Sequence, residues 1–183
     1  MEMRLASCTL RSWRRTDAAS LVQHANNRNV WLNLRDLFPH PYTNTDAMEW
    51  LALVTGRETP LRLAIEVDGA AVGGIGLNPQ GDVYRMSAEL GYWLGEPYWG
   101  RGIMTAAVGA CTDYAFETLG LTRLFATVFA WNPASMRVLE KAGYEREGYL
   151  RQSVLKDGRV IDSVLYARLA SADAADQAIP HRT

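Results

Sequence analysis

Two glycines flank an arginine in the segment Gly100-Arg101-Gly102, where a strand-like stretch of the sequence passes into a helix-like one. Glycines at such a junction let the backbone approach a phosphate closely, and the first N–H groups of the helix, which have no partner inside it, point outward. Arg101 adds a positive charge. The segment is no nucleotide P-loop, because no Gly-Lys-Ser/Thr ends it, and it lacks the third glycine of the dinucleotide fingerprint. Alone, it predicts either an anion-binding turn or a glycine turn with a purely steric role.

A carboxylate inside an apolar strand is the second chemical feature. Glu89 lies in Ser87–Leu94, which reads as a central strand. A carboxylate is unusual there unless it serves a site or is paired. By alternation Glu89 faces away from Tyr92 and Leu94, and a bulge would change that parity. Glu89 is therefore a candidate proton acceptor, directly or through a water, or a structural carboxylate that binds loop backbone.

The stretch from Trp31 to Tyr42 mixes polar groups with aromatic rings and two prolines, and is suited to a pocket wall together with the loop Pro79–Arg85. The candidate substrate-binding residues are Asn33, Asp36, His40 and Tyr42. Loops of this composition also occur as plain surface connections, so that alternative stays open.

Apolar periodicity and turn residues predict the elements that must position these groups. Helices are expected at Ala18–Asn27, Thr45–Thr55 (before Gly56), Gly102–Thr118 and Pro133–Ala142, with a further helical turn in Arg28–Leu34. Strands are expected at Leu5–Trp13 on an edge, 61–67, Ala71–Leu77, Ser87–Leu94, Leu124–Phe129, Tyr144–Lys156 and Val160–Leu169. The absence of a linker or repeat predicts one α/β domain over residues 1–170 and a disordered tail over residues 171–183.

The bulk composition excludes several classes of protein. The 183 residues suit one domain, and a net charge of −1 argues against a nucleic-acid binder. No apolar run is long enough for a signal peptide or a membrane span. Cys8 and Cys111 are far apart, and the three histidines lack metal-ligand spacing, so no disulfide or metal site is expected. A cytoplasmic protein without a metal is the expectation.

Two motifs in sequence order resemble the GNAT superfamily of N-acetyltransferases. Its motif A resembles Gly91-Tyr92-Trp93-Leu94 followed by Trp99-Gly100-Arg101-Gly102-Ile103-Met104-Thr105. Its motif B resembles Asn132-Pro133-Ala134-Ser135 with Val138-Leu139-Glu140-Lys141-Ala142-Gly143-Tyr144. The two motifs are similar to those of the RimJ/RimL branch, which acetylates N-terminal amines of ribosomal proteins. A tryptophan at the position of Trp99 is common in that branch. Met104 replaces a Gly or Ala of the pattern, but a backbone amide binds phosphate whatever its side chain.

The resemblance implies an acyl-CoA N-acyltransferase fold: a mixed central sheet of six to seven strands, splayed in the middle and flanked by about four helices. It also implies acetyl-CoA as cosubstrate. The implied cofactor-binding residues are Tyr92, Leu94, Trp99, Gly100, Arg101, Gly102, Ile103, Met104, Thr105, Asn132 and Ser135. Tyr92 and Leu94 would bond the pantetheine arm through their backbone, and the turn would hold the pyrophosphate. Arg137 and Lys141 are candidates to meet the adenosine phosphates or form a solvated helix face.

In the family the amine attacks the thioester directly, so the cysteines are not nucleophiles. The amine must lose a proton and the leaving thiolate must gain one. Ser135 matches the family position near the sulfur, and is alternatively part of a helix start capped by Asn132. We expect Glu89 to act as the base, with Tyr144 and Tyr149 as weaker alternatives.

The resemblance implies that the acceptor is a primary amine of a peptide or protein N-terminus or of a small molecule, and the sequence does not choose among them. Two other functions remain open. One is a non-catalytic acetyl-CoA sensor of the same fold. The other is a protein-interaction domain that docks a partner through its six tryptophans. A homodimer is expected by analogy with the family.

Overall fold

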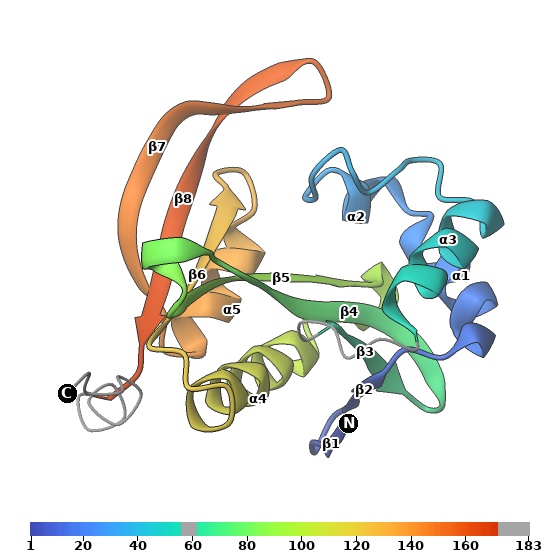
Figure 1. Ribbon diagram of the computed structural model, residues 1–183. Coiled ribbons are helices and arrows are strands. Elements are labelled where there is room, and N and C mark those ends of the chain that lie inside the picture. Colours follow the sequence, from blue (N-terminus) through green and yellow to red (C-terminus); the bar gives the residue numbers. More distant parts are fainter. Residues whose placement is uncertain (56–61, 172–183) are drawn as a thin grey trace.

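The computed structural model describes residues 1–55 and 62–171, and its centre is one mixed sheet in the order β1-β2-β3-β4-β5-β6-β8-β7 (Figure 1). The strands are β1 (Glu2–Arg4), β2 (Thr9–Ser12), β3 (Arg62–Val67), β4 (Ala70–Pro79), β5 (Ser87–Leu94), β6 (Arg123–Phe129), β7 (Glu145–Lys156) and β8 (Arg159–Leu169). The helices are α1 (Ala18–Ala25), α2 (Arg28–Trp31), α3 (Asn44–Val54), α4 (Ile103–Glu117) and α5 (Pro133–Lys141). Three 3-10 turns are η1 (Arg15–Asp17), η2 (Asp82–Tyr84) and η3 (Glu96–Tyr98).

Successive side chains of the strands point to opposite faces of the sheet, and each face has its own hydrophobic core. Ile65 and Val72 pack on the side of α4, with Ile103 and Ala107 of that helix. Their neighbours in sequence, Ala64 and Ala71, pack on the opposite side with residues of α1 and α3. The small side chains on this second face leave room for Trp13, Leu21 and Leu51. Helices thus cover both faces, and the predicted α/β class is confirmed.

The sheet opens in its middle, between β5 and β6. These parallel strands pair only where Ser87–Glu89 lies beside Arg123–Phe125, while β5 continues to Leu94 and β6 to Phe129. On its other edge β5 stays paired with β4 from Ala88 to Leu94. The open edge of Leu90–Leu94 therefore presents backbone groups that no neighbouring strand occupies, and the predicted splay is confirmed.

The described residues form eight strands and five α-helices, more than the six to seven strands and about four helices expected. The added strand comes from the N-terminus, because Glu2–Arg4 pairs with β2 and takes the edge position expected for Leu5–Trp13. The expected turn after Asn27 is the short helix α2. Gly56 and nearly all of the 171–183 tail lie outside the described residues. No helix in the described ranges is long and apolar enough to cross a membrane.

The hairpin of β7 and β8 extends beyond the body of the sheet and curves toward α2 (Figure 1). Asp157-Gly158 forms its tip, with positive φ values of 51° and 71°. The sequence predicts this turn correctly, because Asp-Gly accepts the left-handed conformation that a tight hairpin demands. The position of the tip opposite α2 follows from the tertiary structure.

Candidate active site

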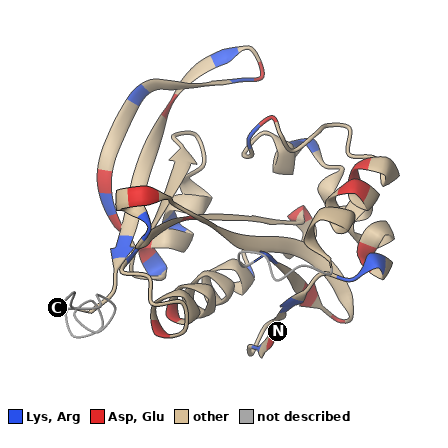
Figure 2. Ribbon diagram, viewed as in Figure 1, with Lys and Arg blue, Asp and Glu red and all other residues tan. Residues whose placement is uncertain are grey.

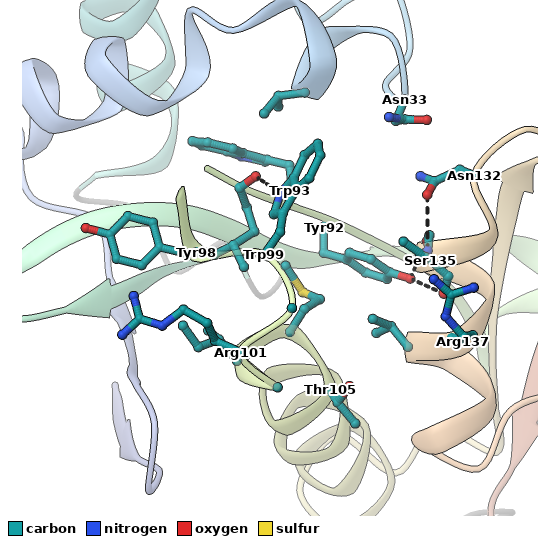
Figure 3. A pocket seen from close by; sticks show the side chains of 18 of the residues that line it. Asn33, Tyr92, Trp93, Tyr98, Trp99, Arg101, Thr105, Asn132, Ser135 and Arg137 are labelled. Atoms are coloured by element: carbon teal, nitrogen blue, oxygen red, sulfur yellow. Dashed lines mark hydrogen bonds between the residues drawn. The ribbon is translucent and has the colours of Figure 1, made fainter. Parts of the chain in front are cut away.

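A cavity of about 310 Å³ lies at the open edge of β5. Its walls come from the end of β5, the turn into α4 with the first turn of that helix, α5, and α2 with the segment that follows it (Figure 3). The lining residues are Val30, Asn33, Leu34, Tyr92, Trp93, Leu94, Tyr98, Trp99, Gly100, Arg101, Gly102, Ile103, Met104, Thr105, Asn132, Ala134, Ser135, Arg137, Val138 and Lys141. All eleven residues that the sequence assigned to a cofactor are brought together here.

The turn before α4 has the backbone that its glycines predict. Gly100 and Gly102 have φ values of 72° and 75°, and Gly102 is the N-cap of α4. A Cβ built on either glycine would meet no heavy atom within 4 Å, so open space lies in front of both. The first N–H groups of a 15-residue helix face this space without intrahelical partners. The turn is therefore shaped to receive an anion.

Two aromatic side chains hold the turn in place. The Trp99 indole Nε1 donates to the Leu94 carbonyl oxygen at 2.7 Å, and the Arg101 guanidinium lies 5.4 Å from the centre of the Tyr98 ring. The Gly95 N–H donates to the Val72 carbonyl oxygen of β4 at 2.8 Å. The Leu94 carbonyl belongs to the same trans peptide and points the opposite way, so it faces the open edge of β5. This carbonyl, expected to bind the pantetheine arm, is thus already engaged by Trp99.

The positive charges of the cavity wall face no negative ones. Arg101, Arg137 and Lys141 line it, and none of the twenty lining residues is Asp or Glu. Among the described residues none of these three cations takes part in an ion pair. The wall therefore favours a ligand with several negative charges.

Two hydroxyl groups meet where the cavity reaches α5. The Tyr92 Oη and the Ser135 Oγ are 2.7 Å apart (Figure 3). The Ser135 N–H donates to Asn132 Oδ1 at 3.1 Å, so Asn132 caps α5 as expected. Burial raises the pKa of Tyr92 to about 12, which keeps its phenol protonated at neutral pH. The pair can deliver a proton to a group that becomes basic beside it.

Glu89 lies on the face of β5 opposite the face that carries the Tyr92 hydroxyl. The register of β4 with β5 has no shift, so the alternation holds and Glu89 points to the face opposite Tyr92. It is not among the residues that line the cavity, and its carboxylate forms an ion pair with Arg35. The Glu89 side chain is 16% exposed. The Glu89 carboxylate therefore lies outside the cavity wall.

The four candidate substrate-binding residues have four different surroundings. Asn33 lines the cavity and donates from Nδ2 to the Asn29 carbonyl at 2.9 Å. Asp36 accepts from Lys156 Nζ at 2.6 Å, and the His40 ring stacks on Trp31 at 5.5 Å. Tyr42 is 5% exposed and packs in the core beside α1 and α3. The structure brings Asn33 alone of these four to the cavity wall.

Sequence reasoning missed several members of the wall, chiefly Val30, Leu34 and Tyr98. Tyr98 stands directly before the glycine turn, which is a signal that could have found it. Val30 and Leu34 are apolar residues in a short helix and a loop, and nothing in their pattern separates a cavity wall from ordinary core packing.

Other sequence candidates lie outside the cavity. The Tyr144 hydroxyl is buried against Thr112 Oγ1 at 2.7 Å, and Tyr149 bonds Asp162 on the exposed hairpin. Cys8 and Cys111 are both buried, and neither forms a disulfide. The tryptophans do not share one exposed surface, because Trp13 is core, Trp93 packs against that core and Trp99 lines the cavity.

Comparisons with known proteins agree with this geometry. A family model described as an acetyltransferase (GNAT) domain matches residues 8–145. The chain is 28% identical over 169 residues to an uncharacterized N-acetyltransferase, p20, of Bacillus licheniformis, covering 88% of this chain and 92% of that protein. It is 37% identical over 102 residues to a putative ribosomal N-acetyltransferase of Bacillus subtilis, covering 56% of this chain and 55% of that protein.

A solved structure shows the same fold. It is a ribosomal L7/L12 alpha-N-protein acetyltransferase in complex with coenzyme A, with a TM-score of 0.80 and 20% identity. The match covers 92% of this chain and 98% of that one. The stretch that the family model matches contains the glycine turn, the open edge of β5 and the start of α5. The chain therefore belongs to the GNAT family of acetyltransferases.

Proposed function

We propose that this chain transfers the acetyl group of acetyl-CoA directly to a primary amine, with both substrates bound at once. One observation carries the proposal: a single cavity joins the anion-binding turn, the open edge of β5 and the Tyr92–Ser135 hydroxyl pair. A pyrophosphate, an extended arm and a thioester are the three parts of acetyl-CoA, and each has a matching part of this wall.

The turn is proposed to hold the pyrophosphate. The N–H groups that begin α4 donate to its oxygens, and Gly100 and Gly102 leave the space that its approach requires. Arg101, Arg137 and Lys141 supply the balancing charge for pyrophosphate and adenosine phosphate. The arm lies along the open backbone of Leu90–Leu94. The N–H groups of β5 on this edge are placed to polarise the thioester carbonyl.

Transfer forms one bond, between the amine nitrogen and the acyl carbon, and breaks the bond between that carbon and sulfur. The Tyr92–Ser135 pair gives a proton to the departing thiolate. The amine gives up a proton, for which we propose Glu89, acting through a water because it does not line the cavity. Asn33 is proposed to face the acceptor, whose amine belongs to a protein N-terminus or a small molecule.

Two measurements test the proposal together. Calorimetry measures binding of acetyl-CoA, and a thiol reagent then measures coenzyme A release with amines that include N-terminal peptides, amino acids and spermidine. Thiol release above the amine-free background, with mass spectrometry showing one acetyl group on the amine, supports the transferase. Tight binding with no amine-dependent thiol release contradicts it and supports a non-catalytic sensor instead.

A further inference from the structure

A buried lysine at the tip of the β7–β8 hairpin reaches across to the segment after α2. The Lys156 side chain is 1% exposed, and its Nζ donates to Asp36 Oδ1 at 2.6 Å. The same nitrogen lies 3.6 Å from the centre of the Trp31 ring. An ammonium taken out of water is costly unless a carboxylate or an aromatic face replaces the water. Here both are supplied by one short segment, 120 residues away in sequence.

The two partners of Lys156 bracket the part of the segment that lines the cavity. Trp31 and Asp36 stand on either side of Asn33 and Leu34, both of which belong to the cavity wall. A group that holds Trp31 and Asp36 at once fixes the path of the chain between them. Lys156 does not touch the cavity itself, so any effect it has on a ligand there passes through this segment.

A second ion pair joins the same two parts of the chain. The Arg28 guanidinium lies 2.7 Å from the Asp157 carboxylate, at the start of α2 and at the hairpin tip. Figure 2 shows charges of both signs on the hairpin tip and on the facing α2 segment. This pair is half exposed and contributes little alone, whereas Lys156 is closed off from water. The two contacts together form a latch.

A local irregularity in β7 supplies the curve that carries the tip to α2. Leu150 pairs with Ser163 and Val154 with Ile161, so Arg151–Ser153 faces the single residue Asp162. Extra residues on one strand bend a hairpin. The Asp162 carboxylate accepts from the Gln152 N–H at 2.7 Å, which holds the bulge in shape. The reach of Lys156 is thus built into the strand.

We propose that Lys156 is a positioning residue for the acceptor: the latch fixes the segment that carries Asn33 and Leu34, and so sets the acceptor-side wall of the cavity. This inference rests on the proposed function, which assigns this wall to the acceptor. The parts of the cavity assigned to acetyl-CoA lie on β5, α4 and α5, and neither contact of the latch involves a residue of these elements. The ion pair between Arg35 and Glu89 joins the segment to β5, but at a residue that does not line the cavity. Loss of the latch therefore weakens acceptor binding and spares acetyl-CoA binding.

Steady-state kinetics and amide hydrogen exchange test the proposal on Lys156→Met, Lys156→Arg and Asp36→Asn. Asp36 is 72% exposed in its side chain, so Asp36→Asn keeps the test valid if Lys156→Met fails to fold. We expect Lys156→Met to raise the acceptor KM by at least about five-fold, with kcat and the Kd for acetyl-CoA within about two-fold, the signature of lost uniform binding. Lys156→Arg keeps the positive charge, so we expect its acceptor KM to rise less than that of Lys156→Met. Exchange at residues 31–36 speeds up in Lys156→Met and Asp36→Asn.

Glu147→Gln is the matched control. It breaks an ion pair with Arg123 at the opposite end of the same hairpin and leaves the acceptor KM unchanged. An unchanged acceptor KM in Lys156→Met, or equal changes in the acceptor KM and the Kd for acetyl-CoA, overturns the proposal. A wild-type protein that acetylates no amine overturns the proposed function instead. The exchange comparison needs no substrate, so in that case it still decides whether Lys156 holds the segment.

Discussion

The hydroxyl oxygens of Tyr92 and Ser135 lie 2.7 Å apart, although one belongs to β5 and the other to α5, on opposite sides of the splay. The contact joins the middle of the open β5 edge to the first turn of α5 inside the cavity. It places two exchangeable protons at one point of the cavity wall.

Replacing the serine hydroxyl tests its role as proton donor. We expect Ser135→Ala to lower kcat by about 10- to 100-fold, because the thiolate then departs with one donor fewer. The Kd for acetyl-CoA stays within about three-fold, since the turn supplies most of the binding. Tyr92→Phe removes the partner hydroxyl and gives a comparable loss. Rapid-quench kinetics isolates the chemical step, and wild-type kcat in Ser135→Ala would remove the serine from the mechanism.

Variants of the Glu89–Arg35 ion pair can distinguish a catalytic role of the Glu89 carboxylate from a structural one. We expect Glu89→Gln to lower kcat by about 100-fold or more, with the Kd for acetyl-CoA unchanged. Arg35→Gln breaks the same pair but keeps the carboxylate, so its kcat stays well above that of Glu89→Gln. Equal losses in the two variants show instead that Glu89 only anchors the Arg35 segment.

The left-handed backbone of Gly102 gives a direct test of the anion-binding turn. Gly102→Ala forces an L side chain to a φ of 75°, at a cost of about 1–2 kcal/mol. Relaxation of that strain tilts the first N–H groups of α4, so we expect the Kd for coenzyme A to rise about 5- to 30-fold by calorimetry.

Gly109→Ala provides the control, because Gly109 lies within α4 away from the cavity wall, with open space at its Cβ. There alanine favours the helix by about 0.5–1 kcal/mol. We expect a slightly higher Tm and wild-type coenzyme A affinity. Tight coenzyme A binding by Gly102→Ala would place the phosphates elsewhere.

The buried His24 makes stability depend on pH. Burial lowers the pKa of His24, which packs against Gly95 and edge-on against Tyr98. The unfolded chain therefore binds a proton more readily than the folded one. The stability contributed by neutral His24 is complete above the unfolded pKa of about 6.5 and is lost as the pH falls toward the lower folded pKa.

The measurement for His24 is the change in Tm between pH 7.5 and 5.5, compared with that of His24→Asn. We expect the wild type to lose roughly 2–4 °C more than the variant over this interval. Other titrating groups contribute to both proteins and cancel in the difference. A larger loss in the variant would mean that protonated His24 finds a partner in the folded protein.

Local sequence patterns predicted much of the fold. The bounds of β5, Ser87–Leu94, follow from alternation, and both Asp-Gly turns occur where hairpins were expected. The Gly100-Arg101-Gly102 turn and the Asn132 cap were also readable, because a positive φ and an N-cap each depend on neighbouring residues alone. The N-terminal edge was harder, since nothing within Glu2–Arg4 reveals that it pairs.

The sequence by itself determined the proposed donor side of this protein, because the backbone groups that would receive coenzyme A are set by a strand, a turn and a helix start that follow one another in the chain. Tertiary structure decided the proposed acceptor side. Between Trp31 and Tyr42 it sent Asn33 to the cavity and Tyr42 to the core, and it paired Glu89 with Arg35. It also brought Lys156 to Asp36 across 120 residues. Side-chain directions in an irregular segment depend on what packs against it, and those partners are distant in sequence.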